Sequence, residues 1–145
     1  MLHFLLTAEM CPQGWSIFSD FCYHINNISQ KNWTDARKIC LNINSDLASI
    51  ASRDENDFVL SLLKDYNVTQ LVWIGLKQNE THQFVWSDGS KVTYPSEAVS
   101  SSGQFGASPY CGLMNASQSV EWKIASCSLS QVKYAICKRK GQWME

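Results

Sequence analysis

The chain has 145 residues and a net charge of −1, with 45% apolar and 12% aromatic residues. This composition is typical of a folded globular domain and not of a disordered chain. The length predicts one domain with its own hydrophobic core. The near-neutral charge provides no field that would attract nucleic acid or an anionic membrane, and no apolar stretch is long enough to span a bilayer. We therefore expect no nucleic-acid partner and no membrane segment in this chain.

The six cysteines indicate the redox compartment. No two of them form a Cys-x-x-Cys pair and no His-x₃-His partner is nearby, so a zinc site fits poorly. An even number of cysteines in a chain of this size favours disulfides and an oxidising compartment. The count alone leaves the pairing open among Cys11, Cys22, Cys40, Cys111, Cys127 and Cys137.

Five Asn-x-Ser/Thr sequons agree with this compartment. A single sequon arises easily by chance, but five of them together with the cysteines favour a glycoprotein. We therefore expect an extracellular location, as a secreted protein or as the ectodomain of a membrane protein. The candidate glycosylation sites are Asn27, Asn32, Asn67, Asn79 and Asn115.

The first ten residues contain a short apolar patch, Leu2 to Leu6. This patch lacks a basic flank and is too short for a complete signal peptide. Residues 1–10 are interpreted as a leader remnant, as sequence appended for expression, or as a first edge strand. The predicted domain follows at residues 11–138.

A strand pair is predicted from Ser16 to Ile25, turning at Ser19-Asp20. A Cys11–Cys22 bridge would close this hairpin with a geometry that suits antiparallel partners. The first helix is predicted from Asn32 to Leu41, because Asn32 is a good N-cap and Asp35 in the first turn complements the helix dipole.

A short strand from Asp46 to Ile50 precedes the second predicted helix. Ser52 and Glu55 have the spacing of a capping box, and the apolar stripe predicts that the helix ends near Tyr66. We expect Asp54, Glu55 and Asp57 to complement the helix dipole on a solvated face.

The run Leu71 to Leu76 is apolar and rich in β-branched and aromatic residues, which predicts a strand buried on both faces. Within it, Gly75 indicates a close backbone approach or a bulge.

The second half of the chain is rich in turns. Strands are predicted at Gln83–Trp86, Lys91–Tyr94, Tyr110–Asn115, Glu121–Ile124 and Val132–Lys138. The segment from Pro95 to Pro109 is dense in Ser, Gly and Pro, and a loop of this length in a compact domain is typically functional or disordered. Lys138, Arg139 and Lys140 form a short basic run that we interpret as solvated, with residues 139–145 as a polar tail.

Catalytic motifs are missing from the sequence. His3, His24 and His82 lie in unrelated segments, and no nucleophile motif, phosphate loop or metal-ligand helix is present. We therefore expect no enzyme and no catalytic residues.

Several motifs occur in an order that resembles the C-type lectin-like domain. The resemblance covers Cys11 to about Lys138 and implies an α+β fold with two helices, two small antiparallel sheets and a long loop. The matching residues are Cys11-Pro12-Gln13-Gly14-Trp15, Cys22-Tyr23, Trp33, Ala36 and Cys40, Asp46-Leu47-Ala48 and Ile50, Glu55 and Phe58, Trp73-Ile74-Gly75-Leu76, Trp86 and Asp88-Gly89, Cys111, Trp122, Cys127 and Ile136-Cys137.

The resemblance also implies one cysteine pairing. Cys40–Cys137 would join the first helix to the last strand, and Cys111–Cys127 would lie beneath the long loop. The third bridge, Cys11–Cys22, would mark the long form of the domain.

Sugar-binding members of the family hold calcium with a Glu-Pro-Asn or Gln-Pro-Asp triplet, an acidic residue before the fourth framework cysteine, and a Trp-Asn-Asp triplet. This chain departs from each of these patterns. It has Trp122-Lys123-Ile124 in place of the last triplet, and Pro109-Tyr110 precede Cys111. Because calcium needs several converging oxygen ligands, we expect no metal and no cofactor at that position.

The resemblance then favours a calcium-independent recognition domain of a cell-surface receptor, similar to the natural-killer or mannose-receptor groups. We expect a protein ligand at the surface of the long loop, and include a homodimer among the expected partners. One alternative is a lectin that binds glycan at an atypical site without calcium, and another is a secreted structural or defence protein. Trp122 is interpreted as core, whereas the candidate ligand contacts are Phe105, Tyr94, Tyr110, Lys123 and Glu97.

Overall fold

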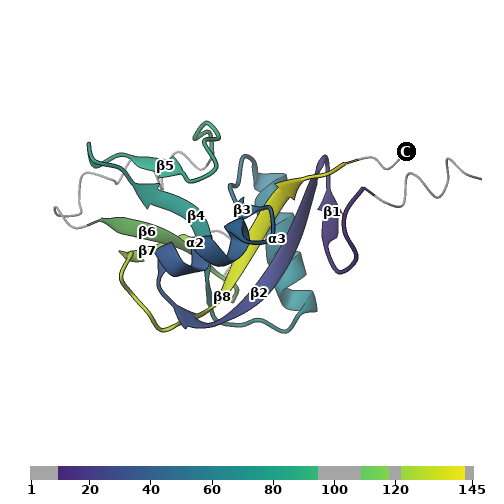
Figure 1. The fold of residues 1–145 in the computed structure, drawn as a ribbon, viewed down its shortest axis with the longest axis horizontal. Coiled ribbons are helices and arrows are strands. Elements are labelled where there is room, and N and C mark those ends of the chain that lie inside the picture. Colours follow the sequence, from purple (N-terminus) through teal and green to yellow (C-terminus); the bar gives the residue numbers. More distant parts are fainter. Residues whose placement is uncertain (1–9, 95–108, 118–121, 143–145) are drawn as a thin grey trace, which may run out of the picture.

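The computed structural model describes residues 10–94, 109–117 and 122–142 of the chain. It contains two helices and a mixed sheet (Figure 1). In chain order the elements are β1 (Ser16–Phe18), β2 (Phe21–Lys31), α2 (Trp33–Leu41), β3 (Asp46–Leu47), α3 (Arg53–Asp65), β4 (Leu71–Gln78), β5 (Phe84–Trp86), β6 (Tyr110–Asn115), β7 (Trp122–Ser126) and β8 (Val132–Lys140). The predicted α+β class is confirmed.

The strands are arranged in the order β1-β2-β8-β4-β6-β7, with β3 added to β8 and β5 added to β4. Both expected antiparallel groups are present, and they are joined where β4 and β8 run parallel, with Val72 opposite Tyr134 and Trp73 opposite Ala135. Near the end of β8, the backbone N–H of Gln142 donates to the carbonyl of Met10 at 3.0 Å. The two ends of the described chain therefore meet beside β1 and β2.

The three disulfides are those that the resemblance implied. Cys11–Cys22 fastens the N-terminal hairpin, Cys40–Cys137 joins α2 to β8, and Cys111–Cys127 joins β6 to the segment after β7. All six cysteines are thus paired. Cys40 and Cys137 are 97 residues apart in the sequence, so their bridge closes the longest loop. It therefore restricts the unfolded chain more than the other two bridges do.

Both predicted helices are confirmed, together with their caps. The Asn32 side chain accepts from the N–H of Asp35, and the Ser52 side chain accepts from the N–H of Glu55. In Figure 1, α2 lies in front of the strands and α3 behind them. Accordingly, one core cluster gathers around α3 and a second contains the buried side of α2. Neither helix in the described ranges is both long and apolar enough to cross a bilayer.

Strand β4 is the central buried strand that the sequence predicts. Its residues Val72, Trp73, Ile74 and Leu76 are fully inaccessible to solvent. The N–H of Gly75 donates to the carbonyl of Ala48 at 2.8 Å. A Cβ atom on Gly75 would lie 2.8 Å from the Leu47 carbonyl oxygen, so glycine allows this close approach.

Two expectations about charged residues are wrong. Glu55 and Lys138 are buried, although both were expected in solvent. The Lys138 ammonium pairs with the Glu55 carboxylate at 2.5 Å, and the Tyr23 hydroxyl donates to the same carboxylate oxygen. A buried charge requires such partners, because the interior provides no water to solvate it. In addition, β8 continues through Lys140, so the strand extends two residues beyond the predicted domain end.

The strand expected at Lys91–Tyr94 is also wrong, since these residues have no regular structure. The Thr93 hydroxyl donates to the carbonyl of Ala51 at 3.0 Å. This contact holds the segment against the loop before α3. The neighbouring β4 already has strand partners in β5, β6 and β8.

Candidate functional site

The predicted ligand surface lies where the long loop leaves and rejoins the sheet. Tyr94 stands before residues 95–108, and Pro109 follows them directly before β6. Two of the five predicted contacts, Glu97 and Phe105, fall outside the described residues. The described part of the surface is therefore built by β4, β5, β6 and the edge strand β7.

One face of this region is aromatic. The Trp122 ring meets the rings of Trp86 and Tyr94 edge to face, with centroids 5.4 Å and 6.0 Å away. The Trp122 indole N–H donates to the side-chain oxygen of the buried Asn56 on α3 at 2.9 Å. Trp122 is thus half-buried, packed against the core cluster of α3 and hydrogen-bonded to α3. Tyr110 is half-buried against the same core cluster.

Lys123 lies on the other face of β7. In the register of β6 and β7, Lys123 is opposite Leu113 and Trp122 is opposite Met114. Leu113 belongs to the core cluster of α2, whereas Met114 belongs to the cluster of α3. Neighbouring residues of a strand point to opposite faces, so the exposed Lys123 side chain is separated from the aromatic face by the edge of the sheet.

A groove of about 660 Å³ lies beside β4, β5 and the end of the long loop. Lys77 and Val85 are partners in the β4–β5 register, and Val85 is 38% exposed. The Lys77 ammonium lies 5.1 Å from the centre of the Trp33 ring. We call this hollow the hairpin groove, and its lining residues include Lys77, Asn79, Thr81, His82, Val85 and Pro109.

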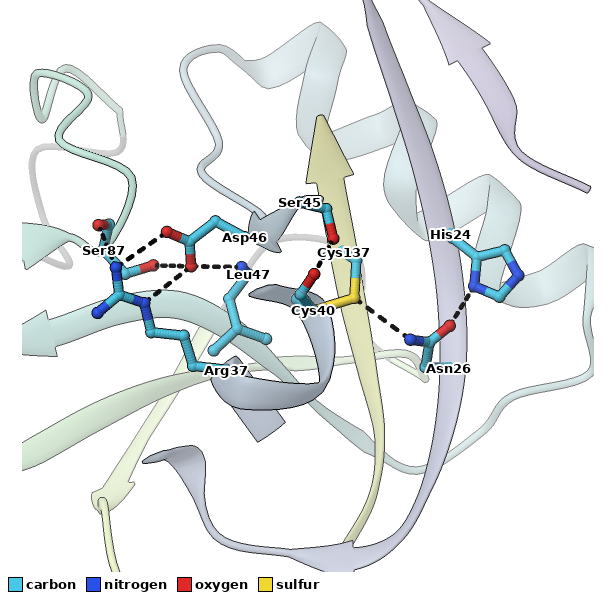
Figure 2. The surroundings of a disulfide bond; sticks show 9 residues. All are labelled: His24, Asn26, Arg37, Cys40, Ser45, Asp46, Leu47, Ser87 and Cys137. Atoms are coloured by element: carbon cyan, nitrogen blue, oxygen red, sulfur yellow. Dashed lines mark hydrogen bonds and ion pairs between the residues drawn. A yellow bond between two sulfur atoms is a disulfide. The ribbon is translucent and has the colours of Figure 1, made fainter. Parts of the chain in front are cut away.

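A polar cluster holds the turn after β5 against α2 and β3 (Figure 2). The Arg37 guanidinium donates to both oxygens of the Asp46 carboxylate, at 3.0 and 3.1 Å, and to the carbonyl of Ser87 at 3.1 Å. The Ser87 hydroxyl donates to the same carboxylate at 3.0 Å. Beside this cluster, the Cys40–Cys137 bridge joins α2 to β8. These contacts and the disulfide fix α2 to the turn after β5, to β3 and to β8.

Sequence reasoning missed the hairpin groove. Of the predicted contacts, Tyr94 and Tyr110 are half-buried on the aromatic face and Lys123 is exposed on the opposite face. The segment Phe84-Val85-Trp86 alternates between buried and exposed positions. Strict alternation of this kind could have identified Val85 as an exposed apolar residue.

The described residues contain no group of three or more His, Cys, Asp or Glu side chains that could hold a metal ion. The candidate glycosylation sites all lie at least partly at the surface. Asn27, Asn67 and Asn79 are exposed, and Asn32 and Asn115 are half-buried.

Comparisons with known proteins agree with this architecture. A family model described as Lectin C-type domain matches residues 29–139. Lithostathine-1-beta from Homo sapiens is 34% identical over 135 residues, which cover 90% of this chain and 79% of the relative. The crystal structure of human lithostathine has a TM-score of 0.77 and 30% identity, covering 92% of this chain and 94% of that one.

Two further solved structures are similar to this chain. A calcium-independent type II antifreeze protein has a TM-score of 0.70 and 25% identity, covering 91% of this chain and 95% of that one. EMS16, described as an antagonist of the collagen receptor integrin alpha2beta1, has a TM-score of 0.62 and 32% identity, covering 88% of this chain and 98% of that one. With its three disulfides, its mixed sheet and a family model that matches most of its length, the chain belongs to the C-type lectin-like domain family.

Proposed function

We propose that this domain recognises an extracellular protein ligand without calcium. The proposed contact surface is the hairpin groove together with the edge strand β7, which carries Lys123. The observation that carries the proposal is the exposed Lys123 side chain on β7. It stands in the triplet where sugar-binding members of the family provide oxygen ligands to calcium.

The charge on Lys123 disfavours calcium at this position. A calcium ion needs six to eight oxygen ligands, and carboxylates supply most of the negative charge that holds it. An ammonium group offers no lone pair and repels a divalent cation. Two observations support this proposal: the described residues contain no group of three or more His, Cys, Asp or Glu side chains that could hold a metal ion, and the structurally similar antifreeze protein is described as calcium-independent.

The chemistry of the hairpin groove supports a protein ligand. The groove places the exposed apolar side chain of Val85 beside the charged side chain of Lys77. Interface cores typically combine apolar contacts with a few charged groups at the rim. The similar structure of EMS16 is described as an antagonist of a receptor, which is a protein target.

An extracellular location follows from the same set of features. Three disulfides and five sequons suit an oxidising, glycosylating compartment. We assign the domain to the ectodomain of a cell-surface receptor, either immune or endocytic. A secreted form of the same recognition domain remains the alternative to test.

The proposal is tested with a defined panel of recombinant extracellular domains, screened against the immobilised protein in chelator. We expect a panel member to bind under these conditions. Val85→Asp should weaken that binding at least tenfold, because it places a carboxylate in the apolar part of the groove. The matched control is Ile17→Asp, at an apolar residue that is 50% exposed on β1 and should leave binding unchanged.

Other outcomes would contradict the proposal. Binding that requires calcium would contradict the role assigned to Lys123. Binding confined to a glycan array in chelator would favour the calcium-independent lectin. Equal losses in both variants would place the contact outside the hairpin groove.

A further inference from the structure

A second groove is lined by residues from the end of β2 and the starts of β4 and β8. This groove has a volume of about 330 Å³ and does not involve the surface of the proposed function. We call it the glutamine groove, and it is lined by Gln30, Gln70, Leu71, Leu129, Gln131, Val132 and Lys133.

The glutamine groove combines an apolar floor with a polar rim. Leu71, Leu129 and Val132 pack against the core cluster of α2 or belong to it. Exposed glutamine side chains from three separate segments stand around them. An amide group donates and accepts hydrogen bonds, and this pairs well with hydroxyl and acetamido groups. A pyranose ring has apolar C–H faces and hydroxyl groups at its edges. The apolar floor can contact a C–H face while the amide groups of the rim bind the hydroxyl groups.

A sequon asparagine lies beside this groove. Asn27 is exposed and precedes Gln30 by three residues, a span of at most about 11 Å. Its side-chain oxygen accepts from the N–H of Ser29 at 3.0 Å, which holds the amide against the segment that leads to Gln30. Across the sheet, Asn27 is opposite Tyr134, and the groove residue Lys133 holds its ammonium 5.6 Å from the centre of that ring.

The backbone between Asn27 and the groove has an uncommon conformation. Ser29 and Gln30 have φ angles of 57° and 63°, which non-glycine residues rarely adopt. The register of β2 and β8 shifts in the same segment, between Asn27 and Lys31. Residues held in such conformations concentrate at ligand-binding sites, because the surrounding structure must maintain them.

We propose that an N-linked glycan on Asn27 folds back into the glutamine groove. Its first N-acetylglucosamine units lie on the apolar floor, and the glutamine amides bond to their hydroxyl and acetamido groups. Attachment to the chain gives the sugar an effective concentration in the millimolar range, so the groove fills even if a free sugar binds weakly. Gln131, directly before β8, and Lys133, within it, form the wall that the glycan contacts.

The test uses the protein in two forms, one made in a mammalian cell line that adds N-glycans and one refolded from bacteria without them. Glycopeptide mass spectrometry determines which sequons are occupied. Hydrogen–deuterium exchange then reports on residues 129–133. We expect Asn27 to be occupied, and we expect Asn27→Gln to speed exchange in this segment several-fold in the glycosylated form only. The matched control is Asn79→Gln, in the β4–β5 hairpin, which should leave this exchange unchanged.

A second measurement separates groove contacts from general effects of a glycan. The double variant Gln131→Ala, Lys133→Ala should lower the melting temperature of the glycosylated form by about 2–4 °C. In the bacterial form these exposed substitutions should change it little, since nothing then occupies the groove.

Several results would overturn the proposal. The first is that mass spectrometry finds no glycan on Asn27. The second is that residues 129–133 exchange equally fast in Asn27→Gln and in the glycosylated parent. The third is that these residues lose protection in Asn67→Gln and not in Asn27→Gln. Asn67 is the other neighbouring sequon, three residues before Gln70. Further protection of residues 129–133 when free chitobiose is added to the glycosylated protein would show an empty groove and a free-sugar site.

Discussion

Among the described residues, two ion pairs hold helices to the sheet, and they differ mainly in their exposure to water. The Lys138–Glu55 pair joins β8 to α3, and its side chains are 7% and 6% exposed. The Arg37–Asp46 pair joins α2 to β3, and its side chains are 37% and 15% exposed. The two ion pairs therefore differ in how much stability the protein loses when one partner is removed. Breaking the buried pair leaves an unpaired charge in the interior, whereas water partly solvates the charges of the other pair.

The buried pair has a full set of partners. The Glu55 carboxylate accepts from the Tyr23 hydroxyl, the Lys138 ammonium and, at 2.8 Å, the N–H of Ala51. The Lys138 ammonium also donates to the carbonyl of Ser49 at 2.9 Å. Each partner offsets part of the cost of removing the two charges from water.

The largest effect is expected from Glu55→Gln. This change keeps the size of the side chain but leaves the Lys138 charge buried without a counter-ion. We expect the free energy of unfolding to fall by about 3–5 kcal/mol. Urea unfolding with the disulfides intact measures it. Asp54→Asn, at the exposed neighbour in the same helical turn, should change it by less than about 0.5 kcal/mol. Equal losses in the two variants would contradict the importance of burial.

Tyr23→Phe tests the same network through its pH dependence. Burial, then the hydrogen bond to Glu55 and the charge of that carboxylate, raise the pKa of the Tyr23 phenol above its usual value. The unfolded chain loses this proton near pH 10 while the folded protein retains it, so the Tyr23 contribution is complete below about pH 10 and declines above it. The variant should lose about 1.5–3 kcal/mol at neutral pH.

The alkaline decline in stability should also be less steep in Tyr23→Phe. Urea unfolding at pH 7 and at about pH 10.5 measures both effects. Tyr66→Phe, at a residue that is 52% exposed, should behave as the parent. An unchanged alkaline slope in Tyr23→Phe would place the titration elsewhere.

Gly75→Ala probes the contact between β4 and the region of the Arg37–Asp46 pair. The new methyl group would lie 2.8 Å from both the Leu47 carbonyl and the Ser87 hydroxyl, which is closer than van der Waals contact. We expect a loss of about 1–3 kcal/mol, because backbone must move to admit it. A thermal melt gives the value, and an unchanged melting temperature would mean that β4 can shift freely at this point.

Asp46→Asn should have the smallest effect of these substitutions. Arg37 loses the charge of its partner but remains partly solvated, and it keeps its bond to the Ser87 carbonyl. We expect a loss of about 1 kcal/mol that shrinks at high salt. Asp35→Asn, in an exposed pair that Lys38 makes at 3.9 Å, is the control and should have almost no effect. A loss as large as that of Glu55→Gln would remove the distinction between the two pairs.

Local chemistry made much of this fold predictable. Asn32 and Ser52 cap their helices through contacts within a few residues, and Gly75 marked a close approach within an apolar run. The disulfides followed only from the family resemblance, because many pairings fit six cysteines equally well. Glu55 and Lys138 were misplaced, since their contact joins positions 83 residues apart and no local pattern reveals it.

The candidate site was less predictable for a related reason. The sequence identified Lys123 because it occupies one position of the triplet that is Trp-Asn-Asp in sugar-binding members of the family. The structure places its side chain exposed on β7. The hairpin groove depends on β4, β5 and Pro109 coming together, which the order of the sequence does not show. Phe105 and Glu97 remain predictions, because they lie outside the described residues.

The central claim is recognition without calcium, and a thermal melt of the protein in calcium and in chelator tests it most directly. A ligand that binds only the native state at a hundredfold excess over its Kd stabilises it by about 2.7 kcal/mol. We predict the same melting temperature in both buffers, because Lys123 stands in the triplet where the family resemblance leads us to expect calcium ligands. A saturable rise in melting temperature with calcium would contradict this account.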